Sequence, residues 1–81
     1  MNTRTKERVM LAASRVKASD NREAAVLGGI VTTTIREGHF EPFRVMAWAD
    51  QALSLKSSER TTMREVAEMT MKFKHEYLGG V

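Results

Sequence analysis

The chain has 81 residues, and its 13 Lys and Arg against 10 Asp and Glu give a formal net charge of +3. This length predicts a single domain, which buries only about 60–65% of the surface of its unfolded chain. The absence of cysteine excludes disulfides and thiolate metal sites, so we expect a second copy of the chain to complete the core. No apolar run approaches the roughly 18 residues of a membrane span, and we expect a soluble, cytoplasmic protein without membrane contact.

Residues 5–18 are predicted to form the first helix, because Val9, Ala13 and Val16 recur at helical spacing. Up to Arg22 the chain carries six basic and two acidic residues, so residues 1–18 form a basic helix or arm. Such an arm can contact nucleic acid or an acidic partner. The candidates are Arg4, Lys6, Arg8, Arg15 and Lys17. The alternative is an ordinary solvated helix face, since these charges are spread out.

Residues 21–37 hold two adjacent glycines and a run of β-branched residues, a composition that would also suit a strand. Helical spacing fits better, because Leu27, Ile30, Val31, Thr34 and Ile35 fall on one helix face, whereas strand alternation leaves neither face apolar. The Asp-x-x-Glu spacing of residues 20–23 is that of a capping box, and Gly38 follows as a C-terminal cap. We therefore predict a helix over residues 21–37.

This predicted helix is weak on its own, since each interior glycine costs about 1 kcal/mol relative to alanine. Gly28 and Gly29 permit a close backbone approach, so we infer that another helix crosses there. Two alternatives stay open: the crossing helix belongs to a second copy, or the glycines fill a tight spot in the chain's own core.

Two further helices are predicted over residues 42–55 and 58–78. Pro42 suits a first helical turn, and Ser57 or Ser58 can cap the last helix. Both segments carry apolar residues at helical spacing. The sequence therefore predicts an all-α fold: a single helical domain over residues 1–81, built as a small bundle of three to four helices and completed by homodimerisation.

Groups that could converge for catalysis are not apparent in the sequence. His39 and His75 lack partners at metal-binding or catalytic spacing, and Gly28-Gly29 lacks the spacing and the lysine of a phosphate-binding loop. We therefore expect no enzyme activity, no metal and no cofactor. Five methionines lie on or near the apolar stripes, where they fill the core or, alternatively, form an adaptable protein-binding surface: Met10, Met46, Met63, Met69 and Met71.

The segment from Glu23 to Gly38 resembles the opening helix of the AriR-like biofilm and acid-resistance regulators, small connector proteins of two-component signalling. The matching residues are Glu23, Leu27, Gly28, Ile30, Val31, Thr32, Ile35 and Gly38, and the resemblance covers about residues 23–77. The chain departs from the family pattern at residues 52–58. The resemblance implies a small all-helical homodimer without enzyme activity, which acts on a signalling or transcriptional regulator by direct contact and can touch DNA.

We accordingly predict a regulatory protein that acts through protein–protein contacts. The residues predicted for self-association are Leu27, Gly28, Ile30, Val31 and Ile35, with Met63, Val66, Thr70, Phe73 and Tyr77 from the last helix. Two alternatives are a phage- or plasmid-encoded inhibitor that blocks a host enzyme by steric contact, and a nucleic-acid-binding accessory protein that uses the basic first helix.

Overall fold

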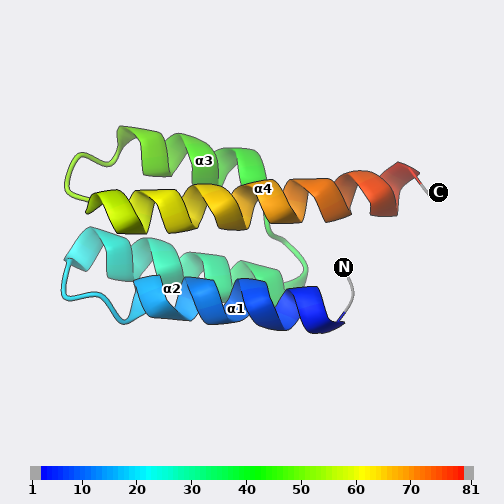
Figure 1. The fold of residues 1–81 in the computed structure, drawn as a ribbon, viewed down its shortest axis with the longest axis horizontal. Helices are drawn as coiled ribbons and strands as arrows, with labels where there is room; N and C mark the ends of the chain where they lie inside the picture. The colour runs from blue at the N-terminus through cyan, green and yellow to red at the C-terminus, as the bar shows by residue number, and fades with distance from the viewer. Residues whose placement is uncertain (1–2, 80–81) are drawn as a thin grey trace.

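Residues 3–79 fold into four helices and contain no strand (Figure 1). The computed structural model describes the backbone of these residues and the side chains of residues 4–72. The helices are α1 (Thr3–Lys17), α2 (Arg22–Glu37), α3 (Pro42–Gln51) and α4 (Ser57–Gly79). The prediction of a small all-α bundle is confirmed. None of the helices in the described part of the chain has the length and apolar content to cross a membrane.

The bundle consists of two antiparallel helix pairs. Helix α1 packs against α2, α3 packs against α4, and α1 also contacts α4 to join the two pairs (Figure 1). The loops at residues 18–21 and 52–56 lie together at one end, and the crossover at residues 38–41 lies at the other (Figure 1). The radius of gyration, 12.0 Å, matches the value of about 12 Å expected for a compact chain of this length.

All four helices contribute to the core. Its buried apolar residues are Val9, Ala13, Val16, Ala24, Leu27, Val31, Ile35, Val45, Ala49, Ala52, Leu55, Met63, Val66 and Ala67. Most of these side chains are small, so the helices approach one another closely. The single chain therefore already buries an apolar face of every helix.

The boundaries of α2 depend on local backbone capping. Asn21 is the N-cap: its Oδ1 accepts hydrogen bonds from the backbone N–H of Glu23 at 3.0 Å and of Ala24 at 3.2 Å. The predicted cap at Asp20 is wrong by one residue. At the other end Gly38 has φ 79°, and the N–H groups of Gly38 and His39 donate to the last carbonyls of α2 in a Schellman motif, as predicted for this glycine.

The threonines of α2 fit a helix because their hydroxyls bond within it. Thr32 Oγ1 donates to the Gly29 carbonyl at 2.9 Å, and Thr34 Oγ1 donates to the Ile30 carbonyl at 2.8 Å. Thr32 is buried, so this bond satisfies a hydroxyl that would otherwise lack a partner. A segment with the composition of a strand thus forms a helix without leaving polar groups unpaired.

Helix α3 ends at Gln51, four residues earlier than predicted. Ala52 adopts an extended backbone, and the turn that follows buries both Ala52 and Leu55. The guanidinium of Arg60 in α4 caps this end: its Nε donates to the Ala49 carbonyl at 2.9 Å, and its Nη2 donates to the Ala52 carbonyl at 2.8 Å. The prediction of residues 42–55 was wrong because a side chain of the next helix sets the boundary.

Helix α4 begins at Ser57, so the predicted serine cap is also wrong. Lys56 precedes the helix, and its backbone N–H donates to Glu59 Oε1 at 2.9 Å. This bond is the glutamate half of a capping box. Glu59 therefore has a structural role: its carboxylate links the start of α4 to the loop before it.

Candidate interaction surfaces

Most residues predicted for self-association lie in the core of the single chain. Leu27, Val31 and Ile35 of α2 are buried, as are Met63, Val66 and Thr70 of α4. The Thr70 hydroxyl bonds to carbonyls of its own helix, at 2.8 Å and 2.9 Å. Phe73 and Tyr77 lie outside the residues whose side chains the structure describes. Within the described residues, only Ile30 of the predicted set is open to solvent, with 41% of its surface exposed.

Gly28 also faces the chain's own core. A Cβ at Gly28 would lie 2.3 Å from the Lys17 nitrogen and 2.9 Å from the Ala13 carbonyl oxygen, both backbone atoms of α1. The close helix crossing inferred from the sequence is therefore present, but the crossing helix is α1 of the same chain. The prediction that Gly28 faces a second copy is corrected, and the intramolecular alternative holds for this glycine.

Gly29 lies about 100° around α2 from Gly28 and faces away from the backbone of α1. A Cβ added there would meet nothing within 4 Å. A hollow of about 380 Å³ lies over this glycine, and its lining includes Lys17, Val26, Ile30 and Thr33. The two adjacent glycines thus have different roles, and only Gly28 is explained by packing within the chain.

We define the outer face of α2 by the half-buried Gly29 and the exposed residues that recur every three or four positions around it. They are Arg22, Val26, Gly29, Ile30, Thr33 and Glu37. Val26 has 47% of its surface exposed, so two β-branched apolar side chains face solvent beside an open glycine. The sequence analysis named Ile30 for self-association together with residues of α2 that are buried, and it gave Val26 no role, so it did not separate this face from the buried one.

A second hollow, of about 230 Å³, lies where α2 meets α3. Apolar side chains of Ile30, Phe40, Val45 and Trp48 line it, and His39, Glu41 and Arg44 are among the polar residues at its edge. Glu41 and Arg44 form an ion pair at 3.0 Å. Because Ile30 also lines the hollow over Gly29, the two hollows adjoin along α2.

The five basic residues predicted as a contact surface occupy two different sides of α1. Arg4, Arg8 and Arg15 share one line along the helix with Leu11, since these positions recur at steps of four, three and four residues. Lys17 instead lines the hollow over Gly29, and Lys6 lies three helical turns earlier on that same side. The structure therefore does not join the five into one patch.

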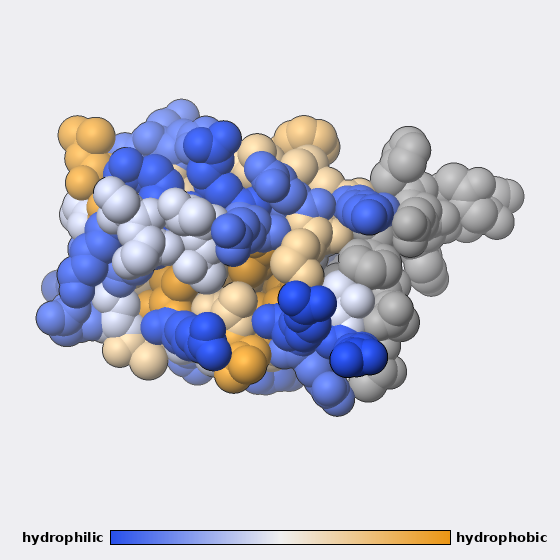
Figure 2. All heavy atoms as spheres, viewed as in Figure 1, coloured by the Kyte–Doolittle hydropathy of each residue, from blue (hydrophilic) through white to orange (hydrophobic). Residues whose placement is uncertain are grey.

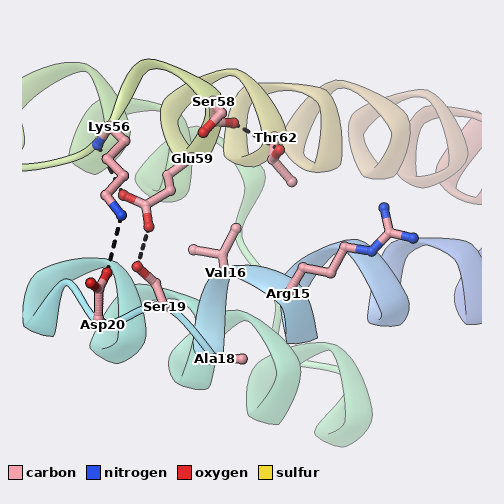
Figure 3. Close-up of a pocket in the computed structure, with 9 residues that line it drawn as sticks. All are labelled: Arg15, Val16, Ala18, Ser19, Asp20, Lys56, Ser58, Glu59 and Thr62. Atoms are coloured by element: carbon pink, nitrogen blue, oxygen red, sulfur yellow. Dashed lines mark hydrogen bonds and ion pairs between the residues drawn. The ribbon is translucent and has the colours of Figure 1, made fainter.

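A polar cluster fastens the two loops at one end of the bundle (Figure 3). The Ser19 hydroxyl donates to Glu59 Oε2, and Lys56 Nζ pairs with Asp20 Oδ1 at 3.0 Å. Nearby, Asn21 Nδ2 donates to the Ser54 carbonyl. We call these contacts the loop clasp, because they connect the α1–α2 loop to the α3–α4 loop and the start of α4.

The loop clasp borders a hollow of about 490 Å³, but its polar groups already bind one another. Hydrogen bonding and charge attraction from Lys56 hold the pKa of Asp20 below its usual range, and the same contact raises the pKa of Lys56. Arg15 extends along the edge of this hollow without a partner among the residues drawn (Figure 3). Within residues 4–72 no buried side-chain polar atom lacks a hydrogen-bond partner, and no group of three His, Cys, Asp or Glu could hold a metal.

No family model matches the chain, and neither curated proteins nor solved structures give a match. The resemblance to AriR-like regulators therefore stays a hypothesis, and the chain's own surfaces are what can indicate its function.

Proposed function

We propose that the protein is a small non-enzymatic regulator that forms a homodimer and binds a signalling or transcriptional regulator by direct contact. The observation that supports this proposal is the outer face of α2. There Gly29 costs about 1 kcal/mol relative to alanine, and no packing within the chain compensates for that cost. A neighbouring helix would use the open space, as α1 does at Gly28.

The charges at the two ends of this face favour a second copy as the neighbour. Arg22 is in the first turn of α2 and Glu37 is in the last, both are exposed, and neither forms an ion pair with the described part of the chain. An antiparallel copy of α2 centred on Gly29 and Ile30 would place Arg22 beside the partner's Glu37, and Val26 beside the partner's Thr33. A parallel copy would place Arg22 beside the partner's Arg22, where like charges repel.

The expected dimer is weak. Helix α2 has 16 residues and is about 24 Å long, so a contact through this helix buries less than the roughly 800 Å² per partner of a standard interface. We therefore expect a dissociation constant on the order of tens of micromolar. With an affinity in this range, the fraction of dimer depends on the concentration of the protein in the cell.

Sedimentation velocity over about 5 to 500 µM protein tests the dimer. Arg22→Glu and Glu37→Arg should each raise the dissociation constant about tenfold, because each variant brings like charges together. The double variant should restore the wild-type constant to within about threefold. Both single changes suit the helix dipole, so the monomer stays folded. Lys72→Glu is the matched control, because Lys72 is exposed on α4 and lines neither hollow beside α2, and it should leave the constant unchanged.

Three results would overturn the dimer geometry. They are a wild-type protein that stays monomeric over this range, a dissociation constant that neither single substitution changes, and a double variant whose dissociation constant does not return to the wild-type value. Gly29→Leu gives an independent check, because its side chain enters open space in the monomer and blocks the partner helix. That variant should remain folded and become monomeric.

Binding of the signalling or transcriptional regulator is tested by affinity capture from cells followed by mass spectrometry. The wild type is compared with a control variant in which the charges of Arg44 and Lys72 are reversed. Recovery of one signalling or transcriptional regulator with both proteins would support the proposal. Recovery of a host defence or nucleic-acid enzyme, together with its inhibition by the purified protein, would favour a steric inhibitor instead.

A further inference from the structure

The exposed side of α1 carries a regular arrangement of charge around one apolar side chain. Arg4, Arg8, Leu11 and Arg15 share a line along the helix, and we call this line the arginine stripe. All four are exposed, and Leu11 has 57% of its surface open to solvent. Figure 2 shows strongly hydrophilic groups on both sides of a hydrophobic one along the edge that α1 forms.

The charges of the stripe are not neutralised within the described part of the chain. The ion pairs found there join Arg44 to Glu41, Lys56 to Asp20 and Arg64 to Asp50, and none involves the stripe. Three guanidinium groups spread over about 16 Å of helix therefore present a linear positive surface. Such a surface attracts carboxylates or phosphates, which guanidinium binds in a two-pronged geometry.

Leu11 distinguishes these two classes of ligand. A phosphate backbone offers no apolar group to cover a leucine in the middle of the arginines, and nucleic-acid contacts of this kind depend on charge alone. A partner helix with carboxylates at the same spacing and one apolar side chain between them would satisfy both features, in the manner of an amphipathic helix that docks through residues three and four positions apart.

We propose that the arginine stripe is the docking site for an acidic amphipathic helix of a partner protein. This inference deepens the proposed function, because it gives the chemistry of the second partner, and it uses a different side of the molecule from the outer face of α2. Homodimerisation and partner docking can therefore succeed or fail separately.

The test uses a synthetic helical peptide of about 15 residues that carries three glutamates and one leucine at the spacing of the stripe. Two further probes are the same peptide with serine in place of the leucine, and a DNA duplex of about 12 base pairs. Binding to ¹⁵N-labelled protein is followed by NMR at about 150 mM salt. The leucine peptide should bind at least about fivefold more tightly than the serine peptide, and the shifted signals should cluster at residues 4–15.

Two variants complete the test. Leu11→Ser should weaken binding of the leucine peptide at least about fivefold and leave DNA binding and dimerisation unchanged. Because serine is a poorer helix former than leucine, the unfolding midpoint should fall only slightly. Reversal of all three arginines to glutamate should abolish binding of both peptides. Tighter binding of DNA than of the leucine peptide, or an unchanged peptide affinity in Leu11→Ser, would overturn the proposal and make the stripe a nucleic-acid contact or a solvated face.

Discussion

Gly28 of α2 lies directly against the backbone of Lys17 at the end of α1. A Cβ at position 28 would be 2.3 Å from the Lys17 nitrogen and 2.7 Å from its Cα. Backbone atoms cannot rotate away as the end of a flexible side chain can. The missing side chain at this position therefore sets how closely α1 and α2 approach, and the adjacent glycine offers a control that lacks this constraint.

The two glycines should respond oppositely to alanine. Gly28→Ala should lower the free energy of unfolding by about 1–3 kcal/mol, because α1 has to move. Gly29→Ala should raise it by about 0.5–1 kcal/mol, because alanine is the better helix former and the space is open. Urea unfolding followed by circular dichroism at low protein concentration measures both. Equal effects of the two substitutions would contradict the packing described for α1 and α2.

The guanidinium of Arg60 should stabilise the folded protein through two hydrogen bonds that a lysine cannot make together. Arg60→Lys loses the two-pronged contact with the carbonyls of Ala49 and Ala52, and we expect a loss of about 1–2 kcal/mol. Arg64→Lys is the matched control, since its contact with Asp50 is 3.8 Å long and half exposed and should contribute about 0–0.5 kcal/mol. Thermal unfolding compares the two variants, and similar losses in both would exclude a capping role for Arg60.

The N-cap of α2 should be found at Asn21 rather than at Asp20. Asn21→Ala removes the acceptor for two backbone N–H groups and should cost about 1 kcal/mol. Asp20→Ala should have a smaller effect, because its carboxylate pairs with Lys56 at the surface. The urea midpoints of the two variants show which substitution destabilises the protein more. A larger loss in Asp20→Ala would support the capping box at Asp20 that was predicted from the sequence.

The Asp20–Lys56 pair should give stability that depends on pH. Because the pKa of Asp20 is lowered in the folded state, its contribution is present above the unfolded value of about 3.9 and is lost as pH falls through the folded value. The pKa of Lys56 is raised, so its contribution is present below about 10.4 and is lost as pH rises through the folded value.

Lys56→Met isolates this contribution. The difference in urea midpoint between wild type and variant should be constant near neutral pH and should shrink below about pH 4. It should also shrink in about 1 M NaCl, where exposed charges are screened. A difference that is the same at pH 3 and pH 7 would show that Lys56 stabilises the protein by packing rather than by charge.

The sequence predicted the helices well because their signals are local. Periodic apolar residues, Pro42 at the start of α3 and Gly38 at the end of α2 act within one turn of the residues they control. The end of α3 was predicted wrongly because Arg60, eight residues beyond Ala52, determines it. A boundary that depends on a side chain of another helix leaves no local pattern to read.

The buried face of α2 was also harder to predict than the helix itself. Hydrophobic periodicity selected Ile30, a large apolar residue, yet the core takes the small Gly28 and the hydroxyl-bearing Thr32 instead. The missing side chain of Gly28 is what lets α1 approach, and a scale based on hydrophobicity ranks both Gly28 and Thr32 low. The sequence could indicate a close crossing at the glycines, but spacing alone does not distinguish a helix of the same chain from one of a second copy.

The arrangement as two helix pairs also bears on how quickly the chain folds. Helices α1 and α2 are neighbours in sequence, as are α3 and α4, and the α1–α4 contact joins residues far apart in the chain. Such mainly local topologies fold in microseconds to milliseconds. Each pair can therefore assemble before the first and last helices meet, and we expect that meeting, late in folding, to limit the rate.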